Sequence, residues 1–222
     1  MKLTVASYNI LHGAMVKYDM DLLVSSIVAC GADIIGIQEV DVDAKRSGNR
    51  DIAQLMAEKL GFYVRFAKAI DLQGGAYGTA ILSRYPITAF ECYPLESGKY
   101  ERRSVGAARI AIGDQEISFW NTHLSYENSE QRQIQLEQLK GLLPADQPWI
   151  LTGDFNTPDF DELRVLGDVR LVNDYGHVHN TFRDSASPID NIVYTAPWQV
   201  ESDGMIENDH SDHNLLYAVI TK

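Results

Sequence analysis

The sequence contains few cysteines and no long hydrophobic segment. Its two cysteines, Cys30 and Cys92, match neither a metal-binding nor a redox spacing. Both lie among apolar neighbours, so we expect buried free thiols and no disulfide framework. No apolar run approaches the ~20 residues that a membrane-spanning helix needs, and the N-terminal residues read as a strand without the features of a signal peptide. These absences predict a cytoplasmic protein, unless a signal peptide has been removed.

Positive charge is also scarce. The chain has 19 Lys and Arg against 31 Asp and Glu, which gives a formal net charge of −12. Such a molecule repels polyanions as a whole, so nucleic acid is disfavoured as a partner without being excluded. Part of the acidic excess could belong to a cation site, whose bound metal ion would offset it locally.

The length and composition are those of a soluble globular protein. A chain of 222 residues with 45% hydrophobic and 23% charged residues can bury a full core without disulfides or structural metals. We expect a single domain, residues 1–222, and a monomer.

Hydrophobic periodicity predicts strands along the whole chain and helices near its two ends. Residues 20–29 and 51–60 have helical spacing and precede Gly31 and Gly61, which would end each helix. Further helices are expected over residues 128–143 and 158–166, with a polar loop over residues 41–50 and an antiparallel meander in the middle third. The expected strands cover residues 2–9, 33–40, 62–67, 77–83, 87–95, 105–112, 116–123, 149–152, 169–173, 189–194, 198–206 and 214–220. This order predicts a layered α/β sandwich, in which two sheets pack together and helices cover the outer faces.

Polar side chains recur where these strands end or begin. They are Asn9, Glu39, His123, Asp154 with Asn156, Asp190, and Asp212 with His213. Any one of them could be ordinary capping or turn chemistry, but we expect several to converge on one sheet edge. Asp190 lies inside a strand, where an unpaired carboxylate is costly, so it needs a partner, and histidine is the obvious candidate. A carboxylate that orients a histidine is the usual arrangement for general-base catalysis.

Other polar residues give weaker signals. His177 and His179 could share a strand face and ligate a metal ion. Arg46 and Arg50, and likewise Arg102 and Arg103, are either solvated or positioned to bind a phosphate.

The ordered motifs together resemble those of the endonuclease/exonuclease/phosphatase superfamily, which has the deoxyribonuclease I-like fold. The resemblance extends from residue 8 to 213 and rests on Tyr8-Asn9-Ile10, Gln38-Glu39-Val40, residues 78–86 (GTAILSRYP), Asn121-Thr122-His123-Leu124, Gly153-Asp154-Phe155-Asn156, Ile189-Asp190-Asn191-Ile192 and Ser211-Asp212-His213. It implies a four-layer α/β/β/α sandwich with two mainly antiparallel sheets. It also implies hydrolysis of a phosphoester that depends on Mg²⁺ or Mn²⁺.

The same resemblance assigns expected roles to the polar residues. Glu39 would be the principal metal ligand, Asn9 would position the metal or Glu39, and Asp212 would serve the metal or its water shell. Asp154 would orient or deprotonate the attacking water, and Asn156 would hold that water or a phosphoryl oxygen. His213, oriented by Asp190, would contact the phosphate or act as base, and His123 would bind a phosphoryl oxygen or assist the leaving group. Arg103 and Arg46 are the expected contacts to the substrate phosphate.

Substrate choice is expected to depend on the loops over residues 41–50, 70–75, 97–103 and 174–187. With the negative net charge, the leading hypothesis is a metal-dependent phosphodiesterase or phosphatase for a small or lipid-derived phosphoester. The alternative is a nuclease acting on DNA or RNA. A third hypothesis, from a different class, is a binding module that uses the same fold without catalysis.

Overall fold

Thirteen strands form two sheets in the computed structural model, which describes residues 1–222. Two neighbouring pairs are parallel, β1 with β2 and β8 with β9, and every other pair is antiparallel. The first sheet has the order β12 (Gln199–Ile206), β13 (Leu215–Thr221), β1 (Lys2–Asn9), β2 (Ile34–Ala44), β5 (Gly75–Ser83) and β4 (Tyr63–Leu72), with β3 (Arg50–Asp51) paired to β2. The second has the order β10 (Arg170–Leu171), β11 (Asp190–Tyr194), β9 (Trp149–Asp154), β8 (Gln115–His123), β7 (Arg103–Ile112) and β6 (Ile87–Leu95).

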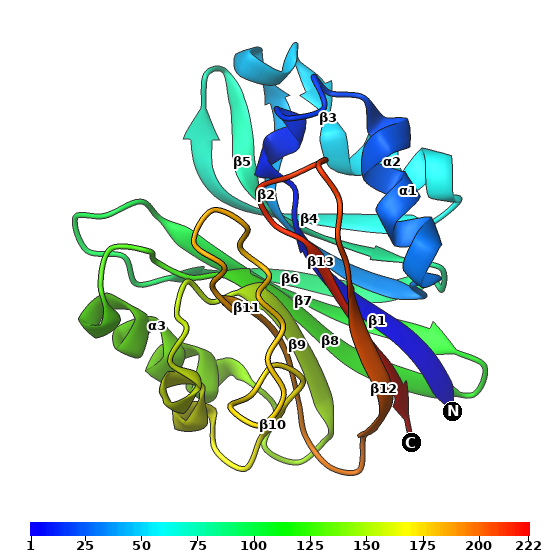
Figure 1. Cartoon of the computed structure of the whole chain (residues 1–222), viewed down its shortest axis with the longest axis vertical. Helices are drawn as coiled ribbons and strands as arrows, with labels where there is room; N and C mark the ends of the chain where they lie inside the picture. Colours follow the sequence, from blue (N-terminus) through cyan, green and yellow to red (C-terminus); the bar gives the residue numbers. More distant parts are fainter.

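Helices cover the outer face of each sheet. Helices α1 (Met20–Cys30) and α2 (Ile52–Leu60) pack on the first sheet, whereas α3 (Ser129–Leu142) and the 3₁₀ helix η3 (Phe160–Leu166) pack on the second (Figure 1). A third apolar cluster fills the space between the sheets. Strand β1 is apolar on both faces because both faces are covered. Leu3 and Val5 face the opposite sheet, whereas Ala6 and Tyr8 face the helices. The predicted four-layer α/β/β/α sandwich is therefore confirmed.

The first two helices begin and end where the sequence predicts. The side chains of Asp19 and Asp51 accept hydrogen bonds from backbone amides of the first turn in α1 and α2. Gly31 and Gly61 end these helices with φ of 65° and 68°, a conformation that favours glycine. No helix in the structure is both long enough and apolar enough to cross a membrane.

Two predicted segments differ in the structure. Strand β2 does not end near Val40 but continues through Ala44, because it pairs with β5 and then with β3, so part of the expected loop over residues 41–50 is strand. The middle third is not one meander. Strands β4 and β5 form a hairpin in the first sheet, whereas β6, β7 and β8 form a meander in the second. The expectation for Cys92 is also wrong, since this thiol lies exposed on the edge strand β6.

A polar contact joins the two sheets beneath their shared end. Asn121 of β8 donates to the carbonyl oxygens of Ile37 and Ala80 in the opposite sheet, each at 2.9 Å. Its own Oδ1 accepts from Gln38 at 2.7 Å and from Thr152 at 3.0 Å. This approach is close enough to require glycine at position 36, where a Cβ would lie 2.4 Å from Asn121 Oδ1. The contact fixes the relative position of the two sheets.

Candidate active site

The strand order brings the predicted polar residues to one end of the sandwich. The carboxyl ends of the parallel strands β1 and β2 lie together, and Asn9 is in register with Gln38. The same holds for β8 and β9, where His123 is in register with Asp154. Strand β11 runs the other way and therefore begins at this end, with Asp190 opposite Asp154.

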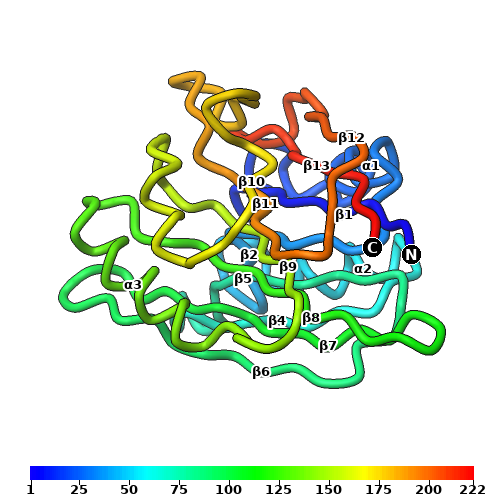
Figure 2. Tube along the Cα trace, turned by 90° about the horizontal axis from the view of Figure 1, so that it is seen from below, coloured from blue at the N-terminus to red at the C-terminus, as the bar shows by residue number.

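In Figure 2 the two termini lie side by side, at the ends of the paired strands β1 and β13.

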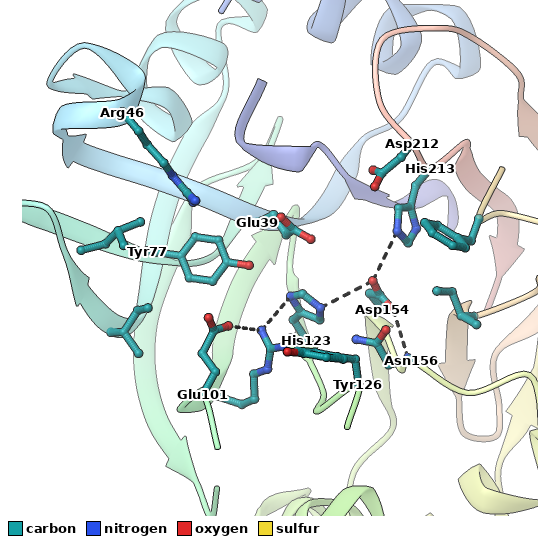
Figure 3. Close-up of a pocket in the computed structure, with 15 residues that line it drawn as sticks. Glu39, Arg46, Tyr77, Glu101, His123, Tyr126, Asp154, Asn156, Asp212 and His213 are labelled. Carbon is teal, nitrogen blue, oxygen red and sulfur yellow. Dashed lines mark hydrogen bonds and ion pairs between the residues drawn. The ribbon is translucent and has the colours of Figure 1, made fainter. Parts of the chain in front are cut away.

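These residues surround a pocket of about 370 Å³. Figure 3 shows the side chains of Glu39, His123 and His213 pointing toward one another across it. The full lining is Glu39, Arg46, Ile70, Leu72, Tyr77, Glu101, Arg103, His123, Tyr126, Asp154, Asn156, Phe182, Ile189, Asp212 and His213. Asn9 and Asp190 are not part of this lining and support it through hydrogen bonds. Each of the four loop segments predicted to select the substrate contributes at least one of these residues.

Glu39 enters the pocket from an irregularity in its strand. The register between β2 and β5 shifts between Ile37 and Val40, and Glu39 has a positive φ of 57°. The bulge therefore directs its side chain into the pocket. Glu39 does not lie at the tip of a strand, contrary to the expectation from the sequence. Burial raises the pKa of Glu39, but the nearby imidazoles of His12 and His123 and the amide of Asn9 outweigh burial and lower it to about 2. Glu39 is therefore ionised at neutral pH.

Asn9 connects two carboxylates of the site. Its Nδ2 donates to Glu39 Oε1 at 3.1 Å and to Asp154 Oδ2 at 3.0 Å. Its Oδ1 accepts from the backbone amide of Leu11 at 3.0 Å, which fixes the orientation of the amide. Because the nitrogen faces the carboxylates, this geometry favours the positioning of Glu39 over direct metal ligation by Asn9.

Asp154 is almost completely buried at the end of β9. Besides Asn9, it accepts a hydrogen bond from the backbone amide of Asn156 at 2.9 Å. The chain turns at Asn156, which has a φ of 53°, so the two residues do not continue one extended strand as expected, although both line the pocket. Burial and the negative charge of Asp190 raise the pKa of Asp154 to about 7. Its carboxyl group can therefore gain or lose a proton near neutral pH.

His213 pairs with the buried carboxylate of Asp190, as the sequence predicts. His213 Nδ1 lies 2.8 Å from Asp190 Oδ2, and its Nε2 lies 3.6 Å from Asp154 Oδ2. Burial lowers the pKa of His213, but the negative charges of Asp190 and Asp154 outweigh burial and raise it to about 10. His213 is therefore an imidazolium at neutral pH with a proton on each ring nitrogen, and its Nδ1–H donates to the carboxylate of Asp190.

His123 is in the opposite protonation state. Burial and the positive charge of Arg103 hold the pKa of His123 well below its usual range. His123 Nδ1 lies 3.3 Å from Arg103 Nη1, and an arginine can only donate, so Nδ1 is the acceptor. The single proton of the neutral ring is therefore on Nε2, which lies 3.6 Å from Asp154 Oδ2.

The two arginines expected to contact phosphate already have carboxylate partners. Arg103 is 3% exposed and forms a salt bridge of 2.8 Å with Glu101. Arg46 donates two hydrogen bonds of 2.8 Å to the buried carboxylate of Asp41. Both line the pocket and each has a carboxylate partner, which favours positioning roles for them, although Nε of Arg103 has no hydrogen-bond partner.

Several lining residues had no signal in the sequence. Tyr77 and Phe182 are ordinary apolar residues of a strand and a loop, and Tyr126 follows β8 with no motif of its own. Phe182 lies against His213, with ring centroids 4.9 Å apart. His12, which is not part of the lining, also approaches the site, and its Nδ1 lies 3.9 Å from Glu39 Oε2. These contacts depend on chain segments that are distant in sequence, so local patterns could not reveal them.

The chain belongs to the endonuclease/exonuclease/phosphatase family, whose model matches residues 6–213. Members of this family are hydrolases of phosphoester bonds and generally use divalent metal ions. The fold is similar to that of an endonuclease/exonuclease/phosphatase from Beutenbergia cavernae, with a TM-score of 0.79 and 19% identity over 99% of this chain and 71% of that one.

Two similar structures come from proteins of different specificity. D. rerio TDP2, solved with a single-strand DNA product, has a TM-score of 0.77 and 18% identity over 100% of this chain and 99% of that one. A mannosyl-6-phosphatase from Bacteroides thetaiotaomicron has a TM-score of 0.74 and 18% identity over 99% and 100%. At these identities the likeness establishes the fold, and the substrate has to be argued from this chain's own pocket.

Proposed function

We propose that this protein hydrolyses the phosphoester bond of a small or lipid-derived substrate with Mg²⁺, or Mn²⁺, as cofactor. The observation that carries the proposal is one small pocket holding an ionised carboxylate, a carboxyl group that titrates near pH 7, a neutral imidazole and an imidazolium. Together these groups can bind a phosphate, activate water and assist a leaving group. We treat residues 1–222 as one domain and the protein as a monomer, both of which stay predictions.

The chemistry of Glu39 and Asp212 fits a divalent cation. Both carboxylates line the pocket, and neither forms a salt bridge with a lysine or arginine. Burial and the negative charge of Glu39 raise the pKa of Asp212, although His213 acts against them. Mg²⁺ prefers one or two carboxylates together with water and phosphate oxygens. We therefore assign Glu39 as its principal ligand, Asp212 to the ion or its water shell, and Asn9 to the positioning of Glu39.

When bound, such an ion supplies positive charge to the phosphoryl oxygens. The chain's own groups perform the proton transfers. Asp154, whose pKa is raised to about 7, accepts a proton from the attacking water and is held in place by Asn9 and Asn156. The imidazolium of His213 faces the developing negative charge on the phosphate. His123 donates its Nε2 proton in a hydrogen bond to a phosphoryl oxygen or to the leaving oxygen.

The walls of the pocket support a small substrate. Its volume of about 370 Å³ is at the lower end of the range for small-molecule sites. Ile70, Leu72 and Phe182 are apolar residues of its lining, which suits a substrate with an apolar part. Arg46 and Arg103, the two arginines of the lining, are paired with carboxylates, and the chain's net charge is −12, so the pocket itself offers little uncompensated positive charge to a nucleic-acid backbone.

The test is a hydrolysis screen with Mg²⁺, with Mn²⁺ and with EDTA. The substrates are an aryl phosphodiester, an aryl phosphomonoester, lipid head-group phosphoesters and abasic duplex DNA. We expect metal-dependent turnover of at least one of the first three, abolished in Asp154→Ala and retained in Asp161→Asn, an exposed control. Preferred cleavage of DNA would support the nuclease, and no turnover with either metal would support the binding module.

A further inference from the structure

We propose that His177, His179 and Asp203 form a second metal site, which binds a transition-metal ion such as Zn²⁺ outside the pocket. His177 Nε2 lies 2.7 Å from Asp203 Oδ1, and His179 Nε2 lies 2.6 Å from the same oxygen. The two imidazole rings meet edge to face, with centroids 4.7 Å apart and an interplanar angle of 84°. None of these three residues belongs to the pocket of the candidate active site.

These nitrogen and oxygen donors suit an ion of intermediate softness, such as Zn²⁺, better than the hard ion Mg²⁺. Two imidazole nitrogens and one carboxylate oxygen converge within 4.8 Å of one another. Zn²⁺ is commonly bound by three such protein ligands with a fourth position open to water, whereas Mg²⁺ requires mainly oxygen ligands. With neutral imidazoles the site carries one negative charge, which a divalent cation offsets. The side chain of His177 is 64% exposed, so an ion can reach the site from solvent.

The backbone around both histidines is already held in place. The side chain of Asn173 accepts from the amide of His179 and donates to its carbonyl oxygen, each at 2.8 Å. The backbones of Asp174 and His177 exchange hydrogen bonds of 3.1 and 2.9 Å, and Arg164 forms a salt bridge of 2.8 Å with Asp174. Because hydrogen bonds already fix the backbone of this loop, little conformational entropy is lost when its two histidines bind a metal ion, which favours affinity for the ion.

The third ligand comes from the other sheet. Asp203 lies on β12 and is in register with Ala218 of β13, whereas the two histidines lie on the segment between β10 and β11. An ion bound by all three would therefore tie the loop over residues 174–187 to the first sheet. Such an ion would join segments that the backbone ladders leave separate.

The same loop supports the candidate active site. Asn173, which holds His179, also donates to the carbonyl oxygen of Asp190 at 3.1 Å. The amide of Asp190 donates to Thr181 Oγ1 at 3.1 Å, and the next residue, Phe182, packs on His213. A metal ion at His177, His179 and Asp203 would thus stabilise the segment that carries Thr181 and Phe182, without taking part in the reaction.

The experiment counts ions and measures thermal stability. Purified protein is stripped with EDTA, dialysed against Zn²⁺, and compared with His177→Gln, Asp203→Asn and the control His210→Gln. His177 is exposed, so its replacement should leave the fold intact, and circular dichroism checks this. His210 is a partly buried histidine outside both sites.

We expect wild type and His210→Gln to bind one more Zn²⁺ per chain than His177→Gln or Asp203→Asn. Their Tm should rise with Zn²⁺ by several degrees more than that of the two ligand variants. Co²⁺ in the same site should give visible absorption bands of a low-coordinate ion, which are lost in His177→Gln. Equal stoichiometry and equal Tm shifts in all four proteins would overturn the proposal and leave the contact as a pair of imidazole hydrogen bonds to Asp203.

Discussion

Replacing Asp190 with asparagine should remove the positive charge of His213 at neutral pH. The Asp190 carboxylate lies 2.8 Å from His213 Nδ1, and both side chains are buried. Its charge is the main reason why the pKa of His213 is raised to about 10 in spite of burial. Asparagine has nearly the same shape but no charge, so this pKa should fall toward the ordinary value of about 6.5. A fall from about 10 to about 6.5 corresponds to a roughly three-thousandfold loss of proton affinity.

The same substitution should change how stability depends on pH. Because the pKa of His213 is higher in the folded protein than in the unfolded chain, the pair's stabilisation is fully present below about pH 6.5. It is lost as the pH rises through about 10. Breaking a buried charge pair costs on the order of 3–5 kcal/mol. The stability of Asp190→Asn should therefore be lower than that of wild type by about this amount at pH 6.5, and the difference should shrink toward pH 10.

Both effects can be measured on protein treated with EDTA. Carbon-13 NMR of the histidine ring carbons, with His213→Gln to assign the signal, gives the pKa of His213 in each protein. Urea unfolding at pH 6.5 and pH 10 gives the free energy of unfolding, with Asp161→Asn as an exposed control. A wild-type His213 that titrates near 6.5, or the same pKa in Asp190→Asn, would refute the reasoning.

Three further predictions concern the metal, the reacting groups and the substrate. Glu39→Gln removes the charge of the residue assigned as principal metal ligand, so the Mg²⁺ concentration for half-maximal rate should rise at least tenfold. The control Glu137→Gln, at an exposed position, should not change this concentration. An equal value in wild type and both variants would remove Glu39 from the ligand set. Asp154→Ala and His213→Ala should each lower kcat by roughly 10³-fold or more, and the double variant should be little slower than the slower single variant. If single-turnover rates of the double variant fall by the product of the two single losses, the two groups act in separate steps. Between low and physiological salt, kcat/KM for a small phosphoester should fall less than about threefold while long duplex DNA stays a poor substrate, and fast cleavage of DNA with a steep salt dependence would favour the nuclease instead.

Residues at the ends of strands were predictable from the sequence. Asn9, His123 and Asp154 follow apolar strands directly, and the parallel pairs place the carboxyl ends of such strands together. The cost of a buried carboxylate predicted a histidine partner for Asp190. The family resemblance implied that this histidine is His213, whose Nδ1 lies 2.8 Å from Asp190 Oδ2. In each of these cases a local pattern and an energetic cost lead to the same conclusion.

Features that depend on non-local pairing were not predictable. The bulge at Glu39 follows from the register between β2 and β5, which no local pattern reveals. The carboxylate that joins His177 and His179 comes from Asp203, 24 residues beyond the second histidine, and meets them only after β12 has paired with β13. The carboxylate partners of Arg46 and Arg103 are local, since Asp41 and Glu101 lie only five and two residues away. They were missed for a different reason, because a sequence does not distinguish an arginine paired with a nearby carboxylate from one free to bind phosphate.

The most direct test of the proposed function is the fate of the oxygen atom of the attacking water. The protein is incubated with an aryl phosphodiester and Mg²⁺ in water enriched in oxygen-18, and phosphorus-31 NMR of any products shows whether the phosphate carries the label. If a water activated by Asp154 attacks phosphorus, the phosphate product carries the label, and neither Glu39→Gln nor Asp154→Ala forms it at a comparable rate. Label in the released alcohol, or equal rates in these variants and wild type, would contradict the proposed reaction.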